Sequence, residues 1–287
     1  MGKLDGKIAL ITGAARGQGR SHALAMASEG ADIIAIDICN DIATNGYSLA
    51  TEADLVETQR LVEKEDKRCV THVVDVRDHG QLKHAVAQSV AELGGLHIVV
   101  ANAGICPLGG NRSRRAFLDA VDVNLVGAIN TISASYEHLG AGASIIATGS
   151  VAALLKGGTD NPAHGPGGAG YTHSKQGVAR YVHDLAIALA PESIRVNAIH
   201  PCNTNTDMLH SEPMYQVFRP DLDSPTREDA EEAFPHMQLM PTSWVEPQDI
   251  SEMVVFLASD SARFVTGMQM RVDAGAALRQ IPAIASS

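Results

Sequence analysis

The chain has 287 residues, of which 45% are hydrophobic and 19% are charged, and its formal net charge is −11. This composition can support a large core and excludes a disordered chain. The acidic balance, without a cluster of Lys and Arg, argues against nucleic acid and anionic membrane surfaces as partners. No apolar run approaches membrane-spanning length, and no signal peptide is recognisable.

The cysteines and histidines indicate a reducing compartment and no metal. The four cysteines stand far apart without a CxxC pattern, and the twelve histidines form neither HxxxH nor HExxH. Closely spaced cysteines or histidines are the usual signs of a disulfide framework or a zinc site. We therefore predict a cytoplasmic protein with reduced cysteines and no metal.

Short apolar runs alternate with helical patterns along the chain. The runs are apolar throughout, as expected of strands that are covered on both faces. We expect strands at 7–13, 32–37, 69–76, 98–104, 143–150, 194–201 and 268–275. We expect helices at 18–29, 53–66, 79–93, 115–139, 171–190 and 248–259. This rhythm predicts a Rossmann-type α/β fold, in which a doubly wound, seven-stranded parallel sheet has helices on both faces, as a single domain over 1–287.

Three stretches interrupt the rhythm. Residues 40–52 lengthen a connection that normally takes two to six residues. Residues 156–170 are rich in Gly and Pro, so we expect no regular structure there. Residues 204–246 are long and rich in Pro and Met, and we expect an irregular substrate lid.

The first expected strand ends in TGAARGQG, residues 12–19. Glycines at a strand-to-helix turn allow backbone N–H groups to approach a phosphate, and the helix N-terminus adds partial positive charge. A tight packing turn without a ligand is the alternative. The predicted dinucleotide-binding residues of this turn are Gly13, Arg16, Gly17, Gln18 and Gly19.

Further polar groups follow the ends of other strands. Asp37 ends the second strand, where a carboxylate accepts hydrogen bonds from ribose hydroxyls and repels a 2′-phosphate, which favours NAD over NADP. A solvated strand-end acid is the alternative. Asp75 ends the third strand, within reach of an adenine, and ANAG at 101–104 ends the fourth. The predicted cofactor contacts here are Asp37, Ile38, Asp75, Val76, Asn102, Ala103 and Gly104.

The sequence GYTHSK places Tyr171 and Lys175 four residues apart, on one face of a helix that follows the strand ending at Ser150. Together with TGAARGQG, ANAG, Asn124 in VDVNLVGA, and RVNAIHPCNTNT, these residues resemble the short-chain dehydrogenase/reductase family. The start of the chain and the stretch TNGYSLATEADLVETQRLVEK are similar to its actinobacterial carveol-dehydrogenase-like group, which is associated with the redox cofactor mycofactocin. The resemblance implies NAD as cofactor and a homotetramer.

The resemblance also implies roles for these residues. Tyr171 is the general base, Lys175 supports its ionisation and holds the ribose, and Ser150 binds the substrate oxygen. A free phenol has a pKa of ~10, so ionisation near pH 7 needs ~3 pKa units, and we expect Lys175 to supply most of this. Asn124 orders a water beside the lysine, or alternatively bonds to backbone. Cofactor contacts at the sixth strand are Pro201, Thr204 and Thr206.

Two departures from the family pattern affect the site. Ser150 and Tyr171 are 21 residues apart, where the family usually has about a dozen residues between them, so 156–170 contains an insertion near the substrate. The usual Pro-Gly after the sixth strand is Pro201-Cys202. We interpret Cys202 as a packing residue, with a reactive thiol as the alternative.

We predict an NAD-dependent enzyme that oxidises a hydrophobic secondary alcohol, terpene-like or carveol-type, to a ketone. Ketone reduction by the same site, a non-catalytic dinucleotide sensor and a nucleotide-sugar epimerase are the alternatives. Apolar residues of the lid either line the substrate pocket or only bury the lid. The residues concerned are Met208, Met214, Tyr215, Phe218, Met237, Leu239, Met240 and Trp244, with Leu154 and Leu155.

Residues 40–52 directly follow Asp37, so they begin beside the expected adenosine ribose. We predict that Asn45, Gly46 and Tyr47 fold over the adenosine and pyrophosphate as a flap, with a ligand-free surface loop as the alternative. Covering a ligand slows its escape more than its entry. The resemblance to the mycofactocin-associated group therefore implies bound NAD(H) that a redox partner recycles in place.

Overall fold

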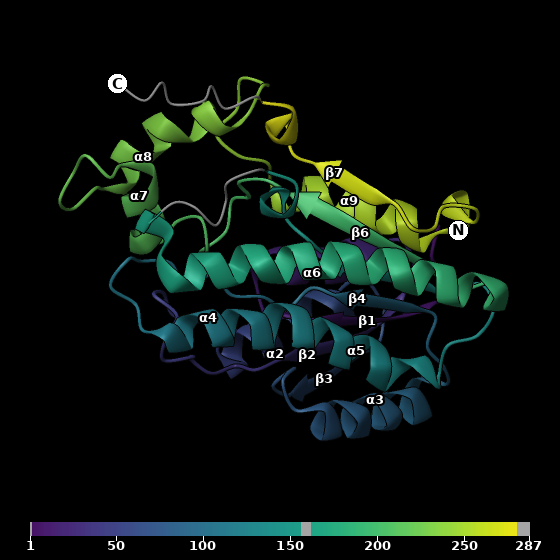
Figure 1. Ribbon diagram of the computed structural model, residues 1–287. Coiled ribbons are helices and arrows are strands. Elements are labelled where there is room, and N and C mark those ends of the chain that lie inside the picture. The colour runs from purple at the N-terminus through teal and green to yellow at the C-terminus, as the bar shows by residue number, and fades with distance from the viewer. Residues whose placement is uncertain (1, 156–161, 280–287) are drawn as a thin grey trace.

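The computed structural model describes residues 2–155 and 162–279, whose strands form one parallel sheet in the order β3-β2-β1-β4-β5-β6-β7 (Figure 1). The strands are β1 (Ile8–Thr12), β2 (Asp32–Asp37), β3 (Cys69–Val73), β4 (Ile98–Ala101), β5 (Ser144–Thr148), β6 (Arg195–Pro201) and β7 (Gln269–Val272). The strand order reverses direction between β1 and β4. Such a switch point opens a crevice at the carboxyl ends of the strands, where ligands bind.

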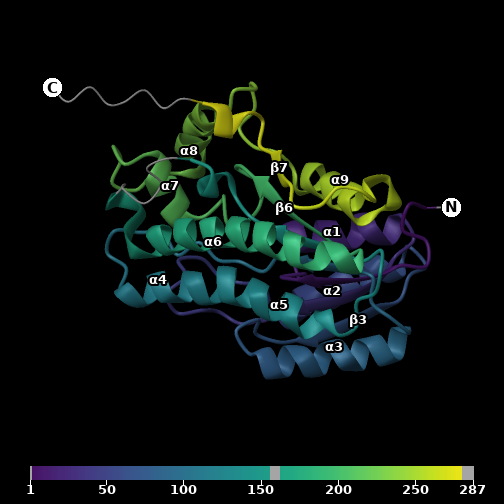
Figure 2. The same cartoon turned by 45° about the vertical axis from the view of Figure 1, so that its right-hand side comes forward.

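Helices cover both faces of the sheet. One core layer is formed with α1 (Gly17–Ser28), α2 (Glu52–Glu63) and α9 (Pro247–Ala258), and the other with α3 (His79–Leu93), α5 (Gly127–Tyr136) and α6 (Gly165–Leu189). Figures 1 and 2 show α3, α5 and α6 side by side on one face, with α4 (Arg114–Val121) beside α6. The predicted fold class is confirmed, and each predicted strand overlaps an observed one.

The helix that carries Tyr171 begins earlier than predicted. A 3-10 turn at Pro162–His164 leads into α6 at Gly165, so residues 165–170, expected to be irregular, are helical. A Cβ on Gly167 would lie 1.9 Å from the Pro107 carbonyl oxygen, and one on Gly170 would lie 2.5 Å from the Phe117 carbonyl oxygen. These glycines allow a close approach between backbones; the prediction was wrong because it took them as chain breakers. Residues 156–161 of the predicted insertion lie outside the described residues.

The single helix predicted at 115–139 is interrupted. A π-helical turn at Asp122–Val126 separates α4 from α5. A Cβ on Gly127, where α5 begins, would lie 2.5 Å from a methyl carbon of Val76. Turns of this kind insert one residue into a helix and occur often at functional sites.

The segment 204–246 is also more regular than predicted. It contains α7 (Glu212–Phe218) and α8 (Arg227–Ala233), and Thr226 and Asp229 form a capping box at the start of α8. Both helices pack around Phe234, which is fully buried. Pro213 stands in the first turn of α7, where a proline starts a helix rather than breaking it. Figures 1 and 2 show α7 and α8 beside each other at the end of the molecule where α6 begins.

A search of the described helices for a stretch long and apolar enough to cross a membrane finds none.

Candidate active site

A cavity of about 690 Å³ lies at the carboxyl ends of the strands. It is lined by all but one of the residues predicted to be catalytic or to bind the cofactor, which come from six different strand ends and from α6. The predicted residues that line it are Gly13, Arg16, Gly17, Gln18, Gly19, Asp37, Ile38, Asp75, Val76, Asn102, Ala103, Gly104, Ser150, Tyr171, Lys175, Pro201, Thr204 and Thr206. Asn124 is the predicted site residue that does not line it.

The three glycines of the turn after β1 have different functions. A Cβ on Gly13 would lie 2.9 Å from the Ala103 Cα, and one on Gly19 would lie 1.9 Å from the Gly13 carbonyl oxygen, so both are needed for packing. Gly17 has a φ of 55°, and a Cβ there would meet only the Thr206 side chain, at 3.4 Å or beyond. No side chain caps the start of α1, at Arg16. The first N–H groups of α1 can therefore bind an anion such as a phosphate.

Asp37, the last residue of β2, is 8% exposed and is held by the same turn. Its carboxylate accepts hydrogen bonds from the Ala15 N–H at 3.0 Å and the Cys39 N–H at 3.2 Å. Burial raises the pKa of Asp37, while these backbone bonds oppose the shift. The acid is thus part of the turn, rather than the solvated strand-end group of the alternative.

Asp75 has a strong partner of its own. The Arg77 guanidinium donates to both of its carboxylate oxygens, at 2.6 to 3.0 Å. A contact from this carboxylate to an adenine stays a prediction. The side chain of Asn102 lies deeper, where it donates to the Thr12 carbonyl at 3.1 Å and accepts from the Thr148 hydroxyl at 3.1 Å.

Ser150, Tyr171 and Lys175 meet at one point of the cavity wall, although 21 residues separate the first two. A hydrogen bond from Ser150 lowers the pKa of Tyr171, which places the two hydroxyls together. The ammonium of Lys175 lies 5.7 Å from the centre of the Tyr171 ring and donates to the Thr148 carbonyl at 2.7 Å. The three side chains predicted to be catalytic therefore line the same cavity.

The ionisation of this group differs from the sequence-based expectation. Burial, and next the Cys106 thiol, raise the pKa of Tyr171 above its usual value. Burial also lowers the pKa of Lys175 to about 8. Burial is the largest effect on the pKa of Tyr171, and Lys175 is not among the groups that shift it. The expected support from the lysine neglected the desolvation of both groups.

Asn124, in the π-helical turn, is 1% exposed and faces the backbone behind the cavity. It accepts from the Ile105 N–H at 2.8 Å and donates to the Ile105 carbonyl at 2.9 Å. It also donates to the Ser174 hydroxyl at 3.2 Å. This is the backbone-bonding alternative, and an ordered water at Asn124 stays a prediction.

Several residues of the site were not predicted. Nδ1 of His200, in β6, lies 3.1 Å from the Ser150 backbone nitrogen and 2.9 Å from the Ser150 carbonyl oxygen, and the tautomer decides which of the two it bonds. Asn203 lines the cavity, and its side-chain nitrogen is buried without a partner among the described residues. Both residues stand in RVNAIHPCNTNT, but no role was assigned to either of them. The pKa of the Cys202 thiol is raised by burial to about 11, which agrees with a packing residue.

The lid residues divide between the two alternatives for their function. Met208, Met214, Phe218, Met237 and Leu155 line the cavity. Tyr215 and Trp244 instead pack against the cluster around Phe234. Leu239 and Met240 are exposed, at 57% and 62%, and Leu154 lies outside the cavity lining.

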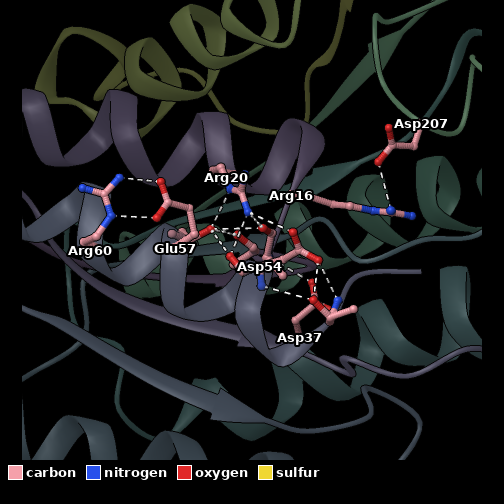
Figure 3. Close-up of polar contacts among 11 residues, drawn as sticks. Arg16, Arg20, Asp37, Asp54, Glu57, Arg60 and Asp207 are labelled. Carbon is pink, nitrogen blue, oxygen red and sulfur yellow. Dashed lines mark hydrogen bonds and ion pairs between the residues drawn. The ribbon is translucent and has the colours of Figure 1, made fainter. Parts of the chain in front are cut away.

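Residues 40–52 contribute Tyr47 and Leu49 to the lining of the cavity, and a flap over the adenosine and pyrophosphate stays a prediction. The Thr44 hydroxyl donates to the Asp119 carboxylate of α4 at 2.6 Å. The Arg16 guanidinium donates to the Ser48 carbonyl and forms an ion pair with Asp207 at 2.9 Å (Figure 3).

Contacts at Gly46 extend this cover. A Cβ there would lie 2.4 Å from the Arg112 guanidinium and 2.5 Å from the Pro213 ring. The turn after β1, the segment 40–52 and the lid therefore touch one another above the cavity. The described residues contain no group of three or more His, Cys, Asp or Glu side chains that could hold a metal ion.

The doubly wound sheet, the glycine turn, the acid after β2 and the Ser150, Tyr171 and Lys175 set together define an oxidoreductase that uses a dinucleotide. A family model described as enoyl-(acyl carrier protein) reductase matches residues 13–277. The chain belongs to the short-chain dehydrogenase/reductase family, as its motifs indicate.

Individual relatives agree with this assignment. A short-chain type dehydrogenase/reductase of Mycolicibacterium smegmatis is 46% identical, over 97% of this chain and 99% of its own. The (−)-trans-carveol dehydrogenase of Rhodococcus erythropolis is 41% identical, over 97% of this chain and 100% of its own. The crystal structure of carveol dehydrogenase from Mycobacterium avium in complex with NAD has a TM-score of 0.91 at 42% identity, over 97% and 100% of the two chains.

Proposed function

We propose that the protein is an NAD-dependent dehydrogenase that oxidises a small hydrophobic secondary alcohol to a ketone, with Tyr171 as general base. The observation that carries this proposal is the meeting of Ser150, Tyr171 and Lys175 on a cavity that Asp37 also lines. The carveol dehydrogenases among the relatives support an alcohol of that kind.

The residues present fit a dinucleotide. Gln18 and Asn203 line the cavity with buried polar atoms that have no partner among the described residues, so a polar ligand would satisfy them. The uncapped start of α1 would hold the pyrophosphate, and Asp37 the adenosine ribose. A carboxylate at Asp37 favours NAD over NADP, because it repels a 2′-phosphate.

When bound, NAD accepts a hydride from the carbinol carbon. Ser150 donates a hydrogen bond to the substrate oxygen, and His200 fixes the backbone that carries it. Tyr171 receives the hydroxyl proton, which requires that its pKa fall from the raised value of the ligand-free site. Lys175 stabilises the phenolate by its charge once it turns from the Thr148 carbonyl toward the ribose.

The reverse reaction is the second candidate. A neutral phenol is the form that donates a proton to a ketone, and burial keeps Tyr171 in that form in the ligand-free site. The set of residues is the same for both directions, and the ratio of oxidised to reduced cofactor decides between them. A pure dinucleotide sensor has no use for this buried set.

The lid residues that line the cavity support an apolar substrate. Met208, Met214, Phe218 and Met237 contribute thioether and aromatic groups to the cavity from the lid. Such a wall binds the carbon skeleton of a terpene-like alcohol of the carveol type through apolar contact. We therefore propose that 204–246 is the substrate lid of one catalytic domain over 1–287.

We also propose that NAD(H) is retained and recycled in place by a redox partner, as the resemblance to the mycofactocin-associated group implies. The contacts of Arg16 with Ser48 and Asp207 support slow release, since they close the cover above the turn. We expect dinucleotide to remain after desalting, and poor steady-state turnover with free NAD alone. Free loss of the cofactor together with fast turnover on soluble NAD would contradict retention.

The compartment and the assembly are further proposals. Four free thiols support a reducing cytoplasm. A homotetramer is supported by exposed apolar residues on the outer face of α4 to α6, among them Leu118 and Ile187 at 50% and 66% exposure. Light scattering of the purified protein measures this directly.

The function itself is tested with a panel of secondary alcohols and ketones, assayed with NAD(H) and NADP(H) and with an artificial electron acceptor. Oxidation of apolar cyclic alcohols with NAD supports the proposal. Turnover that is confined to NADP, or to substrates other than alcohols and ketones, would overturn it.

A further inference from the structure

The segment between β2 and α2 carries a second phenol to the cavity that holds Tyr171. The ring of Tyr47 lines this cavity. Its hydroxyl oxygen is enclosed and has no hydrogen-bond partner among the described residues. A buried hydroxyl without a partner costs the folded protein free energy. The segment therefore holds this hydroxyl in place at the expense of stability. Residues that bind ligands often lower the stability of a protein in this way.

The segment positions the phenol through its own hydrogen bonds. The Asn45 side chain donates to the Tyr47 carbonyl at 2.6 Å, and the Leu49 N–H donates to the Asp41 carboxylate at 2.6 Å. The bond from Thr44 to Asp119 ties the segment to α4. Three separate contacts fix the backbone on both sides of Tyr47, so the phenol is delivered to a defined place.

The groups around the hydroxyl show what kind of partner it lacks. The Cys106 N–H faces the phenol oxygen without a hydrogen bond of good geometry. Because an N–H only donates, the phenol proton has no acceptor even if that bond forms. Burial raises the pKa of Tyr47, so the proton stays on the oxygen. The missing partner is thus a hydrogen-bond acceptor.

We propose that Tyr47 is a ligand-contacting residue of the reaction chamber, whose phenol donates a hydrogen bond to an acceptor oxygen of a molecule bound there. The proposal rests on the proposed function, which brings two such oxygens into the cavity. One is a ribose or phosphate oxygen of the dinucleotide, and the other is the oxygen of the substrate. Both oxygens would lie in the cavity that the ring of Tyr47 lines.

Tyr47 and Tyr171 then have separate functions. Lys175 lies 5.7 Å from the ring centre of Tyr171, whereas the cation that acts on the pKa of Tyr47 is Arg16, and burial, the Cys106 thiol and Tyr171 all raise that pKa. Tyr47 stays neutral and binds, and Tyr171 exchanges the proton. Loss of the Tyr47 hydroxyl should change binding constants and leave the pH dependence of kcat unchanged.

Tyr47→Phe removes only the hydroxyl, and Tyr136→Phe is the matched control, because that phenol bonds to Glu192 at the surface. We would measure the NADH dissociation constant by fluorescence, KM and kcat for an apolar alcohol against pH, and the melting temperature without ligand. For Tyr47→Phe we expect about a tenfold loss in one of the two binding constants. We also expect a melting temperature equal to that of the wild type or higher. Tyr136→Phe should change neither binding constant.

The two binding constants distinguish the acceptor. A larger dissociation constant for NADH identifies an oxygen of the cofactor as the acceptor. A raised KM alone identifies an oxygen of the substrate as the acceptor. Values within twofold of wild type for both would overturn the proposal, as would a lower melting temperature without a loss of binding. Tyr47→Leu, which also loses the ring, should reproduce the loss of binding with a lower melting temperature.

The NADH titration does not depend on turnover. If no alcohol is oxidised by the wild type, the proposed function fails, while a weakened NADH constant in Tyr47→Phe still supports a cofactor contact. An unchanged NADH constant in that situation counts against Tyr47 as well.

Discussion

The two halves of the cavity are built in different ways. The dinucleotide half consists of strand ends and the turn after β1, where a Cβ on Gly13 or Gly19 would clash with backbone and Asp37 is bonded to that turn. The other half consists of side chains from 40–52 and 204–246, segments that extend from the sheet to cover it. Substitutions in the first half would disturb the backbone, whereas side chains in the second half can be exchanged. Cofactor specificity and substrate specificity are therefore separable properties.

The largest expected effect concerns the proton exchange where the two halves meet. Tyr171→Phe removes the oxygen that we propose takes up the substrate proton, so kcat should fall by roughly 10²–10⁴-fold while NADH binding persists. Single-turnover assays with bound NADH measured in parallel would show both. Activity within about tenfold of the wild type would mean that Tyr171 is not the base.

Burial of Lys175 has a consequence for stability. Its pKa is lowered to about 8 in the native protein, against 10.5 for an unperturbed lysine, so between these values the unfolded chain binds more protons. The free energy of unfolding contributed by this group therefore rises with pH across that window, by up to ~3 kcal/mol. In Lys175→Met, this increase in the free energy of unfolding between pH 8 and pH 10 should be absent. Urea titrations at the two pH values measure it. An identical pH dependence in the variant would show that the lysine is not desolvated.

Asp37→Ala tests the rigidity of the dinucleotide half. Loss of bonds to a charged group should weaken NAD binding by roughly 10- to 100-fold, and the bias against NADP should relax because the repulsive charge is gone. Asp32→Ala is the comparison, since that carboxylate of β2 is paired with Arg68 and does not line the cavity. Equal losses in both variants, or a wild type that prefers NADP, would contradict the assignment of Asp37. Titrations with the two dinucleotides give the constants.

Met237→Ala tests the variable half. Met237 lines the cavity, whereas Met240 is 62% exposed outside it. We expect KM for bulky apolar alcohols to rise several-fold in Met237→Ala, at ~0.8 kcal/mol for each methylene that loses contact, with NADH binding unchanged. Met240→Ala should leave KM as it is. A shift of similar size in both variants would remove Met237 from the substrate wall.

The smallest expected effect is at the cover. The ion pair of Arg16 with Asp207 is partly exposed, and such pairs contribute ~0–1 kcal/mol, so Asp207→Asn should speed NADH release by up to about fivefold. Asp221→Asn, which breaks a pair with Arg219 within the lid, is the control. Stopped-flow displacement of NADH measures both rates. An unchanged rate in Asp207→Asn would mean that this pair does not restrain the cofactor.

The sequence predicted the dinucleotide half well, because its residues lie at strand ends that apolar runs locate, and carboxyl ends of parallel strands meet at one edge. It could not show that burial would raise the pKa of Tyr171, since desolvation depends on what surrounds a group in space. His200 and Asn203 were missed although both stand in RVNAIHPCNTNT, because the roles assigned to that stretch went to Pro201, Thr204 and Thr206. The glycines before Tyr171 were misinterpreted because flexibility and close packing select the same residue.

The close contact at the start of α6 also bears on how such an enzyme can diversify. Because Gly167 and Gly170 bring the helix backbone against residues 107 and 117, the helix with Tyr171 and the chain that continues from β4 are joined without side chains between them. Substitutions in the lid can then accumulate without displacing the reacting groups. The glycines therefore keep the helix with Tyr171 in position, while the residues that line the lid side of the cavity can change.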